Sequence, residues 1–115
     1  MHHRWVPFLA VWLLAGSALA AEGISKATDH VLWCASAYAQ LANDASEQSD
    51  AADTELYDNL AATLTRKGID LLRADLVADE RITAIIQAYD DAVYAQLETP
   101  AAPYPIESCE SLVTG

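Results

Sequence analysis

The chain has 115 residues, with 17 aspartates and glutamates against 6 lysines and arginines, and a formal net charge of −11. Such a surface repels phosphate backbones and anionic lipid headgroups, so the composition argues against binding to nucleic acid or to a membrane surface. The length fits one small domain, near the size at which a hydrophobic core alone gives modest stability.

The first residues have the pattern of a secretory signal peptide. Arg4 and the amino terminus form a short positive region, and an almost continuously apolar stretch follows over residues 6–15. Small residues then stand at Ala18 and Ala20, the two positions that a signal peptidase reads. We therefore expect residues 1–20 to be cleaved and the protein to be periplasmic or secreted.

The alternative for the same region is a membrane anchor. Its uncharged run over residues 5–21 is about 17 residues long, at the lower limit for a membrane span. The cleavage pattern favours the signal peptide, so we expect a single domain over residues 21–115 with no membrane anchor. Loss of Arg4 leaves 5 basic against 17 acidic residues and a net charge of −12, with His30 neutral. This charge suits a protein partner that presents a basic or mixed patch.

The first predicted helix covers residues 26–46. Apolar positions from Ile24 to Ala45 are separated by steps of three and four, which is typical of one helix face. Ser25 is a suitable N-cap, and the polar run over residues 43–50 ends the apolar stripe.

The second predicted helix covers residues 51–78, with Asp50 or Asp53 as its cap. Leucines spaced by four residues give it an apolar side, but Gly68 follows two cations, which is a helix-stop signal. Two alternatives follow: a break at Gly68, or a continuous helix in which Gly68 lets a neighbouring element approach closely. The periodicity resumes directly after Gly68, which favours the continuous helix.

The third predicted helix covers residues 79–98, capped by Asp79 and stopped by Pro100. Prolines then recur within residues 100–105, so we expect an extended segment, here called the strap (residues 99–115), that runs back over the helices. No segment alternates with period two for long enough to form a strand. The predicted fold is an all-α antiparallel three-helix bundle with a proline-containing C-terminal strap.

Cys34 and Cys109 are the only cysteines in the chain. Cys34 lies too far from the apolar leader for a lipid anchor, and no C-x-x-C-H string for haem attachment is present. In an oxidising compartment two such thiols pair, so we predict a disulfide that ties the first helix to the strap. Closing a loop of some 75 residues contributes about 4 to 4.5 kcal/mol on the chain-entropy model.

Trp33 lies about 160° from Val31 on a helical wheel, opposite the core stripe of the first helix. Either the strap covers this tryptophan, or it is exposed for a partner. If it is exposed, Trp33 joins Tyr94, Asp90 and Asp91 in a candidate partner surface.

The residues do not form a recognisable catalytic or metal-binding set, so we expect no enzyme activity, no metal and no cofactor. The function that we predict is a non-catalytic binding or regulatory module, which inhibits or modulates an envelope partner. One alternative is an envelope stress chaperone, although five basic side chains give little positive charge at low pH. The other alternative is a small hydrolase that uses His30 and Ser36.

Overall fold

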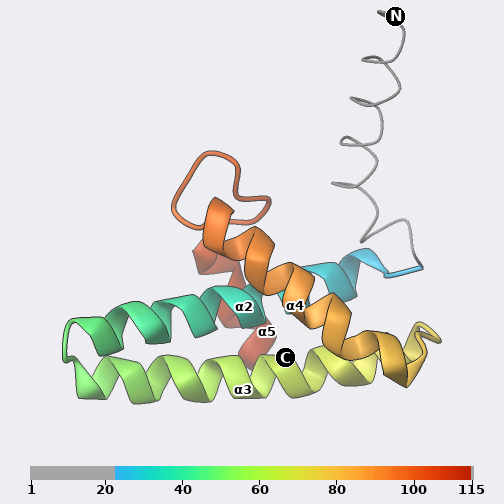
Figure 1. Cartoon of the computed structure of the whole chain (residues 1–115), viewed down its shortest axis with the longest axis horizontal. Coiled ribbons are helices and arrows are strands. Elements are labelled where there is room, and N and C mark those ends of the chain that lie inside the picture. The colour runs from blue at the N-terminus through green and yellow to red at the C-terminus, as the bar shows by residue number, and fades with distance from the viewer. Residues whose placement is uncertain (1–22, 115) are drawn as a thin grey trace, which may run out of the picture.

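The computed structural model describes residues 23–114, so the predicted signal peptide lies outside the described residues (Figure 1). The described range contains helices and no strand. The elements are α2 (Lys26–Glu47), α3 (Ala51–Ala74), α4 (Asp79–Gln96), a 3-10 turn η2 (Ile106–Cys109) and α5 (Glu110–Thr114). The prediction of an all-α bundle with a C-terminal strap is confirmed. Among these residues no helix is both long and apolar enough to cross a bilayer.

The two longest helices form a hairpin whose ends are fixed by side-chain caps. Ser25 Oγ accepts a hydrogen bond from the backbone N–H of Thr28 at 3.1 Å, which satisfies a free donor at the start of α2. Ser49, with a φ of 58°, reverses the chain after α2. Asp50 then caps α3 by accepting from the N–H of Asp53 at 3.0 Å.

Helix α3 passes through Gly68 without a break. Gly68 is buried against Leu32 of α2, and a Cβ at position 68 would lie 2.5 Å from Cδ2 of that leucine. The absence of a side chain therefore lets α2 and α3 approach closely at this point, and this contact compensates for the lower helix propensity of glycine.

Helix α3 ends at Ala74, four residues before the predicted end at residue 78. Leu76 takes a φ of 65°, and the N–H of Val77 returns to the carbonyl of Leu72 at 3.0 Å. This reversal satisfies a terminal carbonyl and buries Val77, whereas Leu76 is 91% exposed.

Helix α4 also differs from the prediction at both ends. Its N-cap is Ala78, which provides no side-chain hydrogen bond, so the prediction that Asp79 is the cap is wrong. Asp79 is the first helical residue and forms an exposed ion pair with Arg73, at 3.2 Å between Nε and Oδ1. At the other end Glu98 adopts a φ of 63°, so the helix stops at Gln96, two residues early.

Asp75, at the end of α3, connects this region to the start of α2. Its Oδ2 accepts from the N–H of Ser25 at 3.0 Å and from the hydroxyl of Thr28 at 2.8 Å. Both bonds stabilise the ionised form of the Asp75 carboxyl and hold its pKa below the ordinary value. The bond from the Ser25 backbone has the larger effect.

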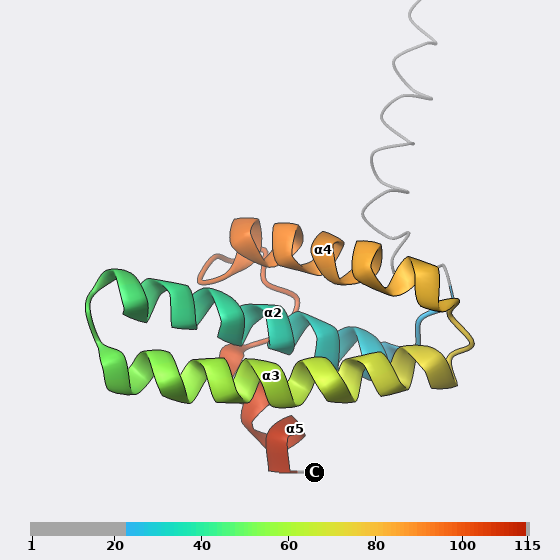
Figure 2. The same cartoon turned by 60° about the horizontal axis from the view of Figure 1, so that its bottom comes forward.

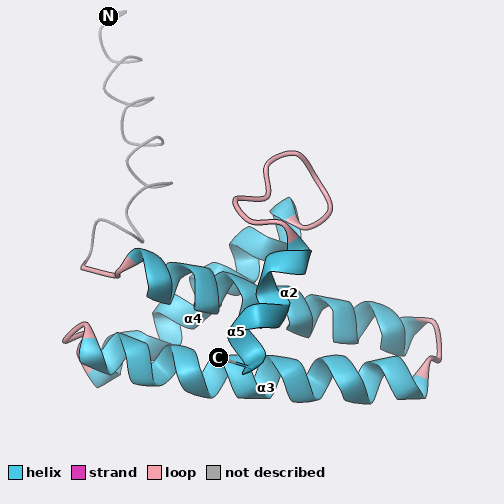
Figure 3. Ribbon diagram, turned by 180° about the vertical axis from the view of Figure 1, so that it is seen from behind, coloured by secondary structure: helices cyan, strands magenta, loops and turns pink. Residues whose placement is uncertain are grey.

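Helix α2 is the centre of the bundle, and every residue from Val31 to Tyr38 is buried. Helix α3 runs antiparallel beside it, whereas α4 and the η2–α5 segment lie on opposite faces of the α2–α3 hairpin (Figures 1 and 3). Figure 2 shows that α4 stops well short of the hairpin tip, where only α2 and α3 lie side by side. On the η2–α5 face, Lys67 donates to the carbonyl of Leu112 at 3.0 Å, which attaches α5 to α3.

Candidate functional site

Cys34 and Cys109 form a disulfide between α2 and η2, with Cα atoms 5.5 Å apart and a sequence separation of 75 residues. Both residues are fully buried, and the described residues contain no free cysteine. The predicted pairing is confirmed. A structural disulfide is consistent with an oxidising compartment, where such bonds persist.

Trp33 is buried, with 2% of its surface exposed. Its indole N–H donates to Oε1 of Gln96 at the end of α4, at 3.0 Å, and the ring of Tyr104 contacts it edge-on with centroids 5.9 Å apart. The strap and the last turn of α4 therefore cover this side of α2. Trp33 is consequently removed from the candidate partner surface.

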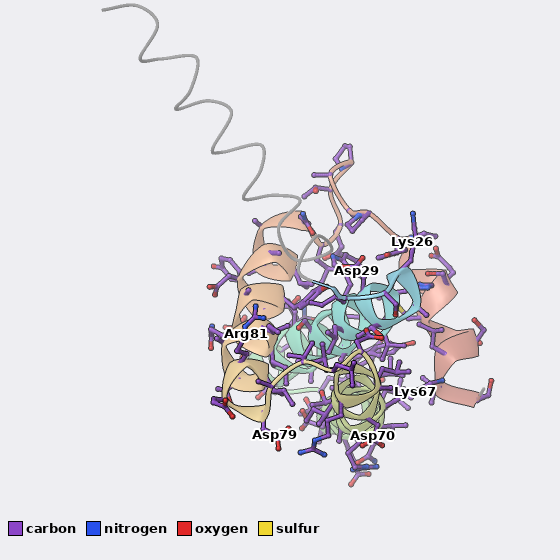
Figure 4. The ribbon with its side chains drawn as sticks, turned by 90° about the vertical axis from the view of Figure 1, so that its right-hand side faces the viewer. Lys26, Asp29, Lys67, Asp70, Asp79 and Arg81 are labelled. Carbon is purple, nitrogen blue, oxygen red and sulfur yellow. A yellow bond between two sulfur atoms is a disulfide. The ribbon has the colours of Figure 1, made fainter. Side chains whose placement is uncertain are left out.

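Asp29 holds both α4 and the strap against α2. The hydroxyl of Tyr89, from α4, donates to Oδ1, and the hydroxyl of Tyr104, from the strap, donates to Oδ2, each at 2.5 Å. Figure 4 shows Asp29 on the side of α2 that faces the strap. Burial first, and then the bonds to Asp29, raise the pKa of both tyrosines well above the ordinary value of 10.0.

His30 is a further contact with the strap. Its ring stacks on Tyr104 with centroids 4.1 Å apart, and its Nε2 lies 2.8 Å from Oγ of Ser108. Because the Ser108 hydroxyl donates its hydrogen to the carbonyl of Pro105 at 2.7 Å, His30 donates to Ser108. This is the reverse of the direction in which a histidine base activates a serine.

No sequence pattern marks Asp29, Tyr89 or Ser108 as residues of a site. The partners of Asp29 lie 60 and 75 residues away, and Ser108 lies 78 residues from His30. No short motif marks such distant contacts. The helical periodicity of α2 predicts on which side of the helix Asp29 lies, but it does not identify the residues that Asp29 contacts.

Ser36 points to a different partner from His30. Its hydroxyl donates to Oδ1 of Asp90 on α4 at 2.6 Å, and Ser36 is 6% exposed. The structure therefore does not bring His30 and Ser36 together, and the pair on which the hydrolase alternative depends does not form.

Two small adjoining cavities surround the bond between Ser36 and Asp90, and together we call them the α2–α4 crevice. One has a volume of about 150 Å³ and the other about 140 Å³. They share Ser36, Ala39 and Asp90, and neither is lined by a lysine or arginine. The remaining lining residues are Leu32, Ala35, Gln40, Thr65, Ile86 and Tyr89.

A larger hollow of about 540 Å³ lies at the end of the hairpin, here called the hairpin-tip hollow. Its lining includes three acids, Asp50, Glu55 and Asp58, and no basic residue. The other lining residues are Ser46, Ser49, Ala51, Thr54 and Asn59.

The remaining predicted surface residues lie together on α4. Asp90, Asp91 and Tyr94 are all exposed, Tyr94 to 77%, and their positions fall within about 100° of the helix circumference. We call this group the α4 face. Asp91 also accepts a hydrogen bond from Nε2 of Gln87 at 3.1 Å, which orients its carboxylate.

Within residues 23–114, no three or more histidine, cysteine, aspartate or glutamate side chains are grouped so that they could hold a metal ion. Comparison of the chain with protein-family models, with curated proteins and with solved structures found no match.

Proposed function

We propose that the protein is a small exported binding module, which inhibits or modulates a protein partner in the periplasm or outside the cell without catalysing a reaction. The observation that carries the proposal is the α4 face. It combines an exposed tyrosine with two acids, and tyrosine is enriched where proteins bind one another because it combines an apolar ring with a polar hydroxyl.

The partner that fits this face presents a basic or mixed patch. A net charge of −12 on residues 21–115 attracts such a patch over a distance and raises the rate of encounter. Charge also argues against nucleic acid as the partner, because a phosphate backbone is repelled.

The exported location is supported by the N-terminal pattern and by the disulfide. Its test is the intact mass of the protein isolated from the cells that make it. We expect a chain that begins at Ala21 and that gains two hydrogens on reduction. A chain that retains residues 1–20 would contradict cleavage.

The test of binding is capture by immobilised mature protein from the envelope and secreted fractions of the same cells. We expect a partner whose association slows clearly between low and physiological salt, while its dissociation changes less. The double variant Asp90→Asn/Asp91→Asn should reduce capture several-fold. The variant Asp70→Asn/Glu107→Gln removes the same charge from exposed positions elsewhere and should retain capture. Equal capture by both variants and by the unchanged protein would contradict the role of the α4 face.

A further inference from the structure

The α2–α4 crevice has an apolar floor and one fixed carboxylate at its rim. Leu32 and Ala35 of α2 and Ile86 of α4 supply the apolar surface. The two cavities meet at Ala39, which is exposed and small, so the crevice opens to the surface there.

Asp90 is held at this rim by Ser36. The buried hydroxyl of Ser36 donates to Oδ1 at 2.6 Å, and Asp90 itself is exposed to solvent. The bond fixes the direction of the carboxylate, so it is ordered before a ligand arrives. Pre-ordering of this kind reduces the entropic cost of binding.

An apolar slot that ends in a fixed carboxylate matches one kind of side chain, which has an aliphatic stem and a cationic head. Arginine and lysine bury their methylene stems along apolar surface while the charged group stays at the edge. Of the two, the guanidinium is the more weakly hydrated and the better suited to a carboxylate, so it loses less on leaving water.

We propose that the α2–α4 crevice takes an arginine side chain of the protein partner, with its stem over Leu32, Ala35 and Ile86 and its guanidinium on Asp90. This inference rests on the proposed function and specifies the partner chemistry at one site. It makes Asp90 the binding residue of the crevice and Ser36 the residue that positions it.

Helix α4 leaves the outer part of the hairpin uncovered (Figure 2), and we expect the partner segment that carries this arginine to lie along that part. Ser36, Ala39 and Ser46 fall on one side of α2, so the crevice and the hairpin-tip hollow lie along the same side. Ten helical residues separate Ser36 from Ser46, a rise of about 15 Å. A second basic side chain about 15 Å from the arginine therefore reaches the acids of the hairpin-tip hollow.

The experiment is an NMR titration of the oxidised chain of residues 21–115 with n-butylguanidinium, and separately with guanidinium, which has no stem. We expect saturable shifts centred on Ala39, Ile86 and Asp90. Butylguanidinium should bind at least about fourfold more tightly than guanidinium, the effect of burying a single methylene. Shifts that are spread over all acidic residues and do not saturate would overturn the proposal.

Matched variants separate the crevice from general acidity. Asp90→Asn should weaken butylguanidinium binding at least about fivefold, whereas Asp70→Asn, the same change of charge at an exposed position of α3 outside the crevice lining, should leave the affinity unchanged. Ala39→Leu keeps every charge but fills the opening of the crevice. In this variant butylguanidinium should bind no more tightly than guanidinium. Unchanged Trp33 emission shows that each variant is folded, and equal effects of Asp90→Asn and Asp70→Asn would overturn the crevice site.

The outcomes also distinguish this inference from the proposed function. Salt-sensitive capture that persists while butylguanidinium does not bind the crevice overturns the arginine site alone. Failure of both capture and crevice binding overturns both proposals.

Discussion

The two halves of the α2–α3 hairpin have the same helical structure and very different surroundings. In the inner half, every residue from Val31 to Tyr38 is buried under α3, α4 and the strap. In the outer half, residues 43–60, Ala45 is the only buried residue. The same helices are therefore the core of the protein at one end and an almost unsupported pair at the other.

This difference shows where stability and binding capacity lie. The disulfide, the Asp29 bonds and the Trp33 contacts are all in the inner half, where the C-terminal segment returns to α2. The acidic hairpin-tip hollow is in the outer half. The α2–α4 crevice is lined by the exposed Ala39, which directly follows the buried run that ends at Tyr38. Changes in the inner half should therefore act on folding, and changes further out should act on binding.

The largest effect is expected from removing the disulfide. Cys34→Ala/Cys109→Ala should lower the free energy of unfolding by about 4.5 kcal/mol, since a loop of 75 residues is no longer closed in the unfolded chain. Urea unfolding followed by emission of Trp33, the only tryptophan in residues 21–115, measures this loss. The control is the unchanged protein in the presence of reductant. If the free energy of unfolding fell by less than about 1 kcal/mol both in the double variant and in the reduced protein, the strap would be held by its other contacts and not by the disulfide.

Two leucines of α3 make the sharpest comparison of the halves. Leu64 is fully buried in the inner half, and Leu56 is 50% exposed in the outer half. Leu64→Ala should cost about 2 to 5 kcal/mol because it leaves a cavity, whereas Leu56→Ala should cost less than about 1 kcal/mol. Unfolding curves of the two variants measured together test this, and similar costs would contradict the contrast.

The strap contact at Tyr104 gives a pH-dependent effect. Tyr104→Phe should cost about 1.5 to 3 kcal/mol at neutral pH, because the hydrogen bond to the carboxyl group of Asp29 is lost. The folded state holds the pKa of Tyr104 above 10.0, so this stabilisation is complete below pH 10 and decreases as the pH rises beyond it.

Urea midpoints between pH 8 and 11 measure that decrease, which should be smaller in Tyr104→Phe. Tyr94→Phe, at an exposed position, is the matched control and should follow the unchanged protein. A slope that is the same in all three proteins would show that the bond does not couple to folding.

The smallest effect is expected at Asp75, which connects the end of α3 to the start of α2. Its pKa is below the ordinary value of 3.8 in the folded state, so its stabilisation is present above that pH and is lost as the pH falls below it. Asp75→Asn should reduce the fall in thermal midpoint between pH 5 and pH 2, and Asp70→Asn should not. Identical acid profiles for the two variants would contradict this.

The sequence was sufficient for features that depend on local spacing. Apolar steps of three and four predicted the helices, the caps at Ser25 and Asp50 follow from residue type, and the two cysteines left one pairing. The prediction for the end of α3 was wrong, because a leucine rarely adopts a positive φ and nothing in the sequence indicates one at Leu76. Local residue propensities do not predict a positive φ that tertiary contacts impose on a residue other than glycine.

The candidate site was less accessible to prediction. The exposed acids and Tyr94 could be placed on one face of a helix from their spacing. The cover over Trp33 and the bond between Ser36 and Asp90 could not, because each joins residues more than 50 positions apart. Whether a polar side chain faces solvent or a distant partner depends on how whole helices pack, and a single sequence does not contain that information.

The pairing of Cys34 with Cys109 also sets the order in which the chain matures. Until the C-terminal segment is in place, the side of α2 that carries Trp33 and Cys34 lacks its cover, although it belongs to the first helix after residue 23. The earliest helix is thus the last to be enclosed, and a chain interrupted before its final residues displays an indole and a free thiol that a finished molecule conceals.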